Sequence, residues 1–372
     1  MTSIIYVGMD VHTTNYTLCC YSMEDDRFFA EVQVEPDAKN ILKYLARIEK
    51  QQSRDCRIVC GYEAGCLGYS LYHQLHAHGI DCVILAPTTM MTKPGKRIKT
   101  DRRDARLISK CLAFHTYSPV YIPTEVDDAV KEYIRMRDDA NSALARVKQQ
   151  IIAFCIRHGK IHDGKSYWTN KHLEWLSSLD LGNKILSEVL QEYLIRYYQL
   201  REQVDMYDMR INELAQAEPY RQKVEKLGCF RGIAAHTALS FCVEVGDFRR
   251  FATAQQFASY LGLVPGECSS GDKQQYTGIT KAGNSHLRKL LVETAQVFGR
   301  SATKSGKSVA LKERQAKCDS LTVAYADKAN ARLKKKYFKI AMRSKVNLAK
   351  TAVAREMACF IWGMMTDNIS CA

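Results

Sequence analysis

The chain has 372 residues, a length that accommodates two or three domains with sizeable cores. Its formal net charge of +14 indicates a polyanionic partner, most simply nucleic acid. No apolar run is as long as a membrane span, and the 14 cysteines include no CxxC pair. We therefore expect a cytoplasmic protein with reduced thiols and no membrane partner, and neither an integral membrane protein nor a disulfide-stapled secreted domain.

The first 120 residues are typical of an α/β domain. Short apolar runs between polar turns predict strands, and apolar residues at helical spacing predict helices. The predicted strands are residues 4–9, 16–21, 28–34, 56–62 and 82–85, and the predicted helices are residues 39–50 and 67–78.

Acidic residues stand where these elements end. Asp10 follows the first predicted strand and Glu63 the fourth, and ligands bind at this edge of α/β sheets. Asp101 and Asp104 lie three residues apart at the start of a predicted helix, so they would share one face. Carboxylates gathered at one point repel unless a cation such as Mg²⁺ lies between them. The pair Asp101 and Asp104 alone is equally compatible with a capped helix N-terminus.

The middle of the chain, residues 121–219, is predicted to be helical. Residues 124–155 contain no Pro or Gly and are amphipathic, and residues 185–217 repeat the pattern. Between them, residues 157–183 are rich in Gly, His and Trp, which indicates a loop or a short helical insertion. Two long helices with one interruption fit an antiparallel hairpin, a dimerising coiled coil or an ordinary packed pair.

The last part, residues 220–372, contains two turns suited to phosphate and a predicted helix at 251–260. Residues 227–238 resemble a helix-hairpin-helix turn, which presents backbone N–H groups to a phosphate. Further on, residues 266–273 combine Gly residues with Ser269 and Ser270. A serine hydroxyl in such an open, basic loop can attack phosphorus and form a covalent intermediate. Taken alone, this composition is more typical of a plain polar turn.

The tail from residue 300 to residue 355 is strongly basic, with few acids to balance it and with aromatic residues interleaved. A charge run is usually a solvated face, but the length and imbalance of this one favour phosphate contacts. Its partner would be DNA or structured RNA, which is recognised mainly by shape and backbone.

Three segments together resemble the DEDD motif of a RuvC-like, ribonuclease-H-type domain. They are Val7-Gly8-Met9-Asp10, Gly61-Tyr62-Glu63-Ala64-Gly65 and Lys99-Thr100-Asp101-Arg102-Arg103-Asp104-Ala105-Arg106. The version is similar to that of the serine-containing DEDD insertion-sequence transposases, now known as bridge-RNA-guided recombinases. Residues from Gly262-Leu263-Val264-Pro265 to Leu287-Arg288 resemble the transposase domain of the same family. Aligned through Pro265, the family's catalytic serine falls on Ser270 and not on Ser269.

The resemblance implies a fold, a site and partners. The fold would be α/β plus α: a RuvC-like domain over residues 1–120, a coiled-coil hairpin over 121–219 and a mainly helical transposase domain over 220–372. Asp10, Glu63, Asp101 and Asp104 would bind Mg²⁺, and Ser270 would form a phosphoserine linkage to DNA. A bridge RNA would pair with donor and target DNA. Homodimers would assemble to a homotetramer in a prokaryotic cytoplasm, at the nucleoid when acting.

Cations near these motifs are the candidate nucleic-acid contacts. They are Lys93, Lys96, Arg97, Lys99, Arg102, Arg103, Lys273, Lys281, Arg288, Lys334, Lys335 and Lys336. Two other functions stay open at this point. A metal-dependent Holliday-junction nuclease would use water and the four acids without Ser270. A non-catalytic nucleic-acid-binding protein would keep the fold without the chemistry.

Overall fold

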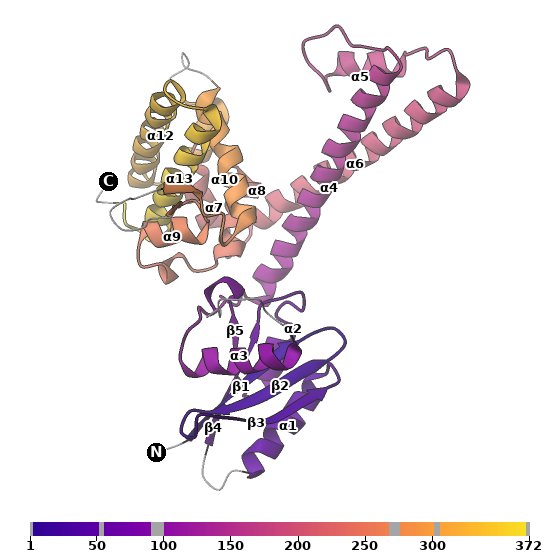
Figure 1. Cartoon of the computed structure of the whole chain (residues 1–372). Coiled ribbons are helices and arrows are strands. Elements are labelled where there is room, and N and C mark those ends of the chain that lie inside the picture. The colour runs from indigo at the N-terminus through magenta and orange to yellow at the C-terminus, as the bar shows by residue number, and fades with distance from the viewer. Residues whose placement is uncertain (1–2, 52–55, 91–99, 268–275, 301–305, 370–372) are drawn as a thin grey trace. The chain divides into compact units, whose positions relative to one another are not determined.

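The computed structural model describes residues 3–51, 56–90, 100–267, 276–300 and 306–369. The chain forms two compact units, Met1–Ile122 and Pro123–Ala372, each with its own hydrophobic cores (Figure 1). The first unit is α/β and the second is mainly helical, which confirms the predicted class of each part. None of the described helices is long and apolar enough to cross a membrane.

A five-stranded mixed sheet organises the first unit. Its strands are β1 (Ser3–Val11), β2 (Tyr16–Ser22), β3 (Arg27–Val34), β4 (Cys56–Glu63) and β5 (Asp81–Leu85). They lie in the order β3-β2-β1-β4-β5, with β1, β4 and β5 parallel and with β2 antiparallel to both β1 and β3. All five predicted strands are confirmed, and the topology is consistent with a ribonuclease-H-like domain.

Helices cover both faces of this sheet. Because side chains alternate along a strand, Ile5, Val7 and Met9 of β1 point to one face. There they pack in one core with buried residues of α1 (Ala38–Gln51) and α2 (Ser70–Ala77). Tyr6 belongs to the other face, where it packs with buried residues of α3 (Asp101–Ala113). A short 3-10 helix, η1 (Pro87–Thr89), follows β5.

Gly8 lets α3 approach the middle of β1 closely. A Cβ built on Gly8 would lie 2.0 Å from the carbonyl oxygen of Ala105 and 2.4 Å from the amide nitrogen of Ser109. Both are backbone atoms of α3 and cannot turn aside. Any larger residue at position 8 would therefore push α3 away from the sheet.

Two helices of 33 residues each begin the second unit. They are α4 (Glu125–Arg157) and α6 (Lys184–Gln216), and the short helix α5 (Asn170–Ser177) lies in the insertion between them. The long helices pack antiparallel, since Arg137 near the start of α4 pairs with Asp208 near the end of α6 at 2.7 Å. Further along, Ile151 and Leu194 share a core. The two helices thus form an antiparallel hairpin in the structure, while a coiled coil stays a prediction.

The remaining elements form a helical bundle with one small hairpin. The helices are α7 (Arg221–Gly228), α8 (Ala235–Val245), α9 (Ala254–Tyr260), α10 (Ser285–Ala295), α11 (Val309–Gln315), α12 (Ser320–Ala341) and α13 (Val346–Met365). Two 3-10 helices, η2 (Phe248–Arg250) and η3 (Gln296–Gly299), lie between them, and β6 (Pro265–Glu267) pairs antiparallel with β7 (Tyr276–Ile279). Residues of α4 and α6 belong to the core of this bundle, so the boundary predicted at 219/220 lies inside one compact unit.

The turn between α7 and α8 differs from the phosphate-binding turn that residues 227–238 resemble. Cys229, Phe230 and Ile233 are fully buried. The amide of Arg231 donates to Asn330 Oδ1 at 2.9 Å, and the amides of Phe230 and Ile233 donate to carbonyl oxygens within the turn. These N–H groups are used inside the protein, so this connection packs the bundle and does not offer them to phosphate.

Candidate active site

Two of the predicted acids lie on neighbouring parallel strands at one level. β1 and β4 pair in a constant register from Ser3–Cys56 to Met9–Tyr62, and the next step sets Asp10 beside Glu63. Both lie on the α3 face of the sheet, because Met9 and Tyr62 belong to the core on the opposite face.

The first turn of α3 brings the other two acids to the same place. Thr100 caps the helix, since its side chain accepts a hydrogen bond from the amide of Arg103, and this leaves Asp101 and Asp104 free of the capping role. The close packing at Gly8 holds the start of α3 against the end of β1. Ligand atoms of Asp10, His12 and Asp101 all lie within 4.8 Å of one another.

Asp10 is the inner residue of this acidic group. Burial raises the pKa of its carboxyl, His12 opposes the shift, and the negative charges of Asp104 and Asp101 raise the pKa further. Its Oδ2 atom is buried without a hydrogen bond among the described residues, although His12 Nε2 lies 3.3 Å away. A carboxylate with one buried, weakly partnered oxygen and further carboxylates nearby fits a divalent cation.

Glu63 and Asp104 lie at the margin of the group. Asp104 acts on Asp10 through its charge, and Glu63 is exposed at the end of β4. Neither belongs to the closest set of ligand atoms, which contains Asp10, His12 and Asp101. The fold thus brings three predicted acids, Asp10, Asp101 and Asp104, within electrostatic reach of one another and sets Glu63 on the adjoining strand.

The predicted serine loop is framed by the β6–β7 hairpin. Ser269, Ser270 and Lys273 lie outside the described residues, between the two strands. At the base of the hairpin, the amide of Thr280 donates to the carbonyl oxygen of Val264 at 2.9 Å. The hairpin therefore returns the chain on itself on either side of the loop.

Comparisons with known proteins agree with this arrangement of an acidic α/β unit and a helical unit. Residues 7–156 match a family model described as a transposase, of the DEDD type of IS110 elements, and residues 225–314 match the transposase IS116/IS110/IS902 family. The transposase of insertion sequence element IS1533 from Leptospira borgpetersenii is 32% identical over 340 residues, which are 90% of this chain and 95% of that protein. The chain belongs to the IS110 family of DEDD transposases.

A second relative covers most of the same length. The y4qE protein of Sinorhizobium fredii, described as a transposase, is 36% identical over 307 residues, 82% of this chain and 75% of that protein. The predicted family is confirmed, and the chain is a DNA transposase. Membership in a DEDD family also points to a divalent metal, in agreement with the acidic group at Asp10.

His12 of the transposase is a site residue that sequence reasoning missed. It follows Asp10 by two positions, just past the last residue of β1, and its side chain is about half exposed. Its place two positions after Asp10 was the signal that could have found it. An imidazole next to carboxylates can serve as a further metal ligand or position one of them.

The predicted nucleic-acid contacts of the transposase differ in exposure. Lys93, Lys96, Arg97, Lys99 and Lys273 lie outside the described residues. Arg102, Arg103, Lys281 and Lys335 are exposed, and Lys334 and Lys336 are partly buried. Arg288 is engaged inside the protein: its Nη1 donates to the carbonyl oxygens of Leu261 at 2.9 Å and Ala282 at 3.1 Å. The other nitrogens of its guanidinium are not used in these two bonds, so a phosphate contact of Arg288 stays a prediction.

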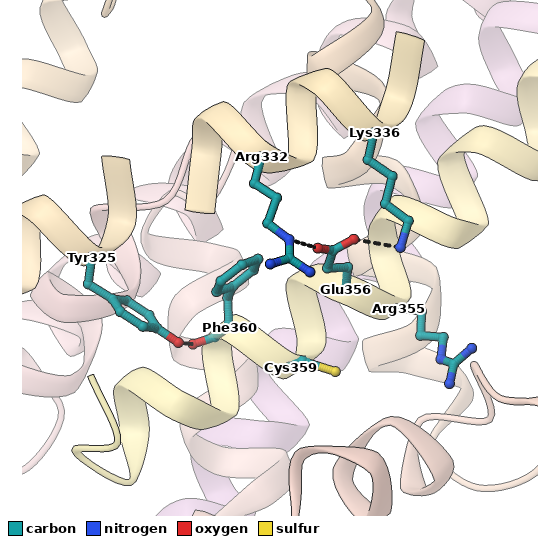
Figure 2. A pocket seen from close by; sticks show the side chains of 7 residues that line it. All are labelled: Tyr325, Arg332, Lys336, Arg355, Glu356, Cys359 and Phe360. Carbon is teal, nitrogen blue, oxygen red and sulfur yellow. Dashed lines mark hydrogen bonds and ion pairs between the residues drawn. The ribbon is translucent and has the colours of Figure 1, made fainter. Parts of the chain in front are cut away.

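The basic tail is partly neutralised where α12 meets α13. Glu356 lies between Arg332 and Lys336, and its Oε2 is 2.5 Å from Lys336 Nζ (Figure 2). These residues, with Arg355 and Phe360, line an open pocket of about 470 Å³. Another face of α12 stays cationic, because Lys328, Lys335 and Lys339 are exposed at helical spacing.

Proposed function

We propose that this transposase is a bridge-RNA-guided, site-specific DNA recombinase that cleaves strands with Ser270 as nucleophile beside a metal-binding acidic site. The observation that supports metal-dependent strand cleavage is that carboxylate oxygens of Asp10, at the end of β1, and Asp101, at the start of α3, lie within 4.8 Å of each other. Sequence similarity to the family's serine-containing domain supports the choice of Ser270.

The acidic group would hold the metal, and we propose Mg²⁺. Asp10 and Asp101 are the proposed inner ligands, with His12 and Asp104 close enough to complete or orient the set, and we propose Glu63 of the adjoining strand as a further ligand. When bound, such an ion supplies positive charge that polarises a phosphate and stabilises the charge formed as it reacts. The chain's own part is to keep the carboxylates apart and aimed, through the packing of α3 on Gly8.

The proposed reaction is a transesterification at phosphorus. The Ser270 oxygen forms a bond to phosphorus, the bond from phosphorus to the 3′ oxygen breaks, and the serine proton is matched by the proton that the 3′-hydroxyl gains. The phosphoserine linkage keeps the bond energy, so reversal with an exchanged strand rejoins the DNA without a further energy source.

The assembly is part of the proposal. A bridge RNA would pair with donor and target DNA, and exposed cations of α3 and α12 would contact phosphates of either nucleic acid. The first unit would act as a RuvC-like domain, and α4 with α6 as a coiled coil that pairs protomers. Dimers would join as tetramers at the nucleoid, with the serine of one protomer completing the acidic site of another.

Ser270→Ala tests the nucleophile. The change removes one oxygen between Gly-rich neighbours, and such substitutions usually stay within about 0.5 kcal/mol, so DNA and RNA binding should survive. Covalent attachment to DNA and recombination should both disappear. The measurement is denaturing electrophoresis after incubation with labelled substrate, with Ser269→Ala as the matched control.

The outcomes separate the candidate functions. If Ser270→Ala still cleaves at the normal rate, water is the nucleophile and the junction nuclease replaces this proposal. If only Ser269→Ala loses the DNA-linked band, the nucleophile lies one residue earlier and the mechanism stands. If wild-type protein binds DNA but never cleaves it, the protein is a non-catalytic nucleic-acid-binding protein.

A further inference from the structure

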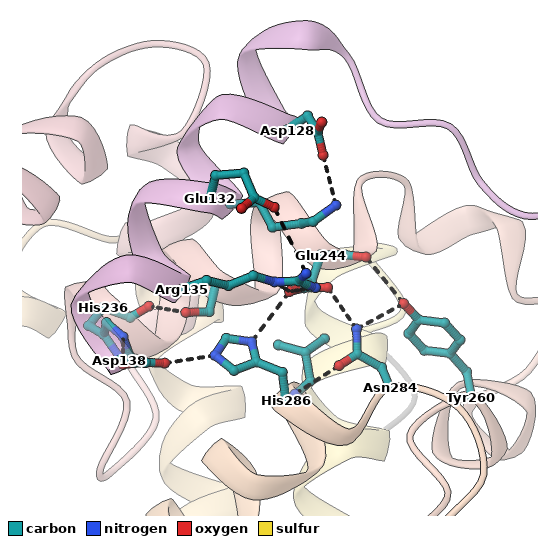
Figure 3. Close-up of polar contacts among 12 residues, drawn as sticks. Asp128, Glu132, Arg135, Asp138, His236, Glu244, Tyr260, Asn284 and His286 are labelled. Carbon is teal, nitrogen blue, oxygen red and sulfur yellow. Dashed lines mark hydrogen bonds and ion pairs between the residues drawn. The ribbon is translucent and has the colours of Figure 1, made fainter. Parts of the chain in front are cut away.

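A partly buried group of polar and charged side chains links α4, α8 and the start of α10 (Figure 3). It joins Asp138 of α4, His236 and Glu244 of α8, and Asn284 and His286 at the start of α10; we call it the His286 cluster. We propose that His286, held between Asp138 and Glu244, is a positioning residue that locks the base of the β6–β7 hairpin. The link to strand cleavage rests on the proposed function of Ser270.

His286 bridges two carboxylates that come from different helices. Its Nε2 lies 2.8 Å from Asp138 Oδ2, and its Nδ1 lies 3.4 Å from Glu244 Oε1. Burial alone would lower the pKa of His286, but the interactions with Asp138 and Glu244 raise it to about 9. The ring is therefore an imidazolium at neutral pH, and its charge holds α4, α8 and α10 together.

Glu244 connects His286 to Asn284, because one of its carboxylate oxygens faces each of them. The Glu244 side chain is only 6% exposed, and its Oε2 accepts a hydrogen bond from Asn284 Nδ2 at 2.9 Å. Asn284 also caps α10, because its Oδ1 accepts from the amide of Leu287 at 3.0 Å. Its own amide donates to the carbonyl oxygen of Tyr260 at 2.9 Å. Asn284 thus joins the cluster, the start of α10 and the end of α9 through its side chain and its backbone N–H.

The chain segments on either side of the hairpin are packed too closely to slide. The amide of Lys281 donates to the carbonyl oxygen of Gly262 at 3.1 Å, next to the Arg288 contacts described above. A Cβ on Gly283, whose φ is +73°, would lie 2.0 Å from the carbonyl oxygen of Tyr260. Loosening Asn284 therefore loosens both segments that enter the hairpin.

Hydrogen exchange of the full-length transposase tests the inference without relying on its chemistry. In His286→Gln, amides of residues 276–284 should exchange about tenfold faster or more, which is the signature of local opening. Amides of α12 should keep their wild-type rates, whereas a general loss of stability would raise them too. His172→Gln, at a buried histidine of α5 in the same unit, is the matched control and should leave the hairpin unchanged.

The reaction supplies the second measurement. His286→Gln should bind DNA within about threefold of wild type yet form the DNA-linked band about tenfold more slowly, a loss confined to the chemical step. If hairpin exchange in His286→Gln equals that of wild type, the inference is overturned whatever the reaction does. If wild-type protein forms no DNA-linked band, the proposed function fails, and hydrogen exchange alone decides the inference.

A second variant covers the case in which His286→Gln does not fold. Glu244→Gln keeps an oxygen for Asn284 but removes the charge that faces His286. It should give the same faster exchange at residues 276–284 and unchanged exchange in α12, and wild-type exchange at the hairpin would again overturn the inference.

Discussion

The carboxyl of Asp10 is both partly buried and repelled by neighbouring carboxylates. One of its oxygens has no hydrogen bond among the described residues, and Asp101 and Asp104 add negative charge nearby. Such a residue lowers the stability of the metal-free fold, and a cation that neutralises the group would repay that cost.

Asp10→Asn tests this reading, because it removes the repulsion and the ligand charge together. The metal-free variant should melt a few degrees higher than wild type, the shift that about 1 kcal/mol gives a domain of this size. Mg²⁺ should stabilise wild type, by about 2.7 kcal/mol at a concentration 100 times its Kd, and should not stabilise the variant. Thermal unfolding with and without Mg²⁺ measures both effects.

The control for Asp10→Asn is Glu24→Gln, at the exposed turn between β2 and β3. It should respond to Mg²⁺ as wild type does. A lower melting temperature for metal-free Asp10→Asn, or an undiminished Mg²⁺ effect, would contradict the assignment of Asp10 as a ligand.

Protonation of His286 makes the stability of the second unit depend on pH in the alkaline range. The residues that face it are Arg135 and Asp138 of α4 and His236 and Glu244 of α8. Because the pKa of His286 rises from 6.5 to about 9 on folding, its contribution is complete below pH 6.5 and lost as pH rises through 9. Between pH 7 and 9.5 the free energy of unfolding should fall by on the order of 2 kcal/mol through this group.

Denaturant unfolding of the second unit at pH 7 and at pH 9.5 measures this fall in the free energy of unfolding. His286→Gln should be less stable than wild type at pH 7 and nearly equal to it at pH 9.5, because it has no proton to lose. An equal slope with pH in both proteins would show that another group is responsible. At the acidic end, burial opposes the shift, but His286 and Arg135 lower the pKa of Glu244 to about 2, so its charge persists under mild acid.

At the scale of elements, the contact between α3 and β1 decides where the acids meet. The helix reaches the sheet only because Gly8 leaves room for its backbone, and Asp101 lies one turn before Ala105 at that contact. The N-cap at Thr100 sets where the helix begins. The acidic group therefore depends on where α3 begins and how closely it packs on β1, and not on the acidic residues alone.

Gly8→Ala should separate helix and sheet. The added methyl would overlap backbone atoms of α3, and overpacking of this kind costs about 1–3 kcal/mol or more. We expect a lower free energy of unfolding for the first unit and weaker Mg²⁺ binding, although no acid has changed. Denaturant unfolding and Mg²⁺ titration measure these effects.

Gly65→Ala is the matched control, since a Cβ there meets its nearest atom at 3.9 Å, an ordinary contact. It should keep wild-type stability and metal binding. If Gly8→Ala behaves like Gly65→Ala, the close approach of α3 does not position the acids.

For the whole molecule, the net charge and the cationic face of α12 suit a polyanionic partner, and the proposed function makes that partner an RNA as well as DNA. We expect purified protein to retain RNA. Nuclease-treated protein should lose recognition of its DNA sites and regain it with one specific transcript. If RNA-free protein recombines its DNA sites normally, the protein itself recognises the DNA sequence and no guide RNA is needed.

The α12 cations can be tested in the same assay. Replacing Lys328, Lys335 and Lys339 by Gln should reduce the slope of log affinity against log salt by about 2–3, because each phosphate contact contributes about 0.7–0.9. The control replaces three exposed lysines of α1, namely Lys39, Lys43 and Lys50. An equal loss in both variants would indicate a general effect of charge and not a contact surface.

Much of the first unit was readable from the sequence, because strand and helix periods are local properties of the chain. The five strands, the acids at their ends and the long helices α4 and α6 followed from patterns of ten to thirty residues. So did the family, since its motifs lie in short contiguous segments. The helical bundle was predicted less sharply, because its buried faces are shared among elements far apart in sequence.

Only the tertiary structure decided which side chains meet. His12 joins Asp10 and Asp101, Arg288 turns inward to two carbonyl oxygens, and Lys336 pairs with Glu356. The His286 cluster draws residues from α4, α8 and α10, which no spacing along the chain relates. A sequence determines the period and charge of each element by itself. The partners of a charged side chain are set by the packing of elements, because burial removes the water that would otherwise solvate it.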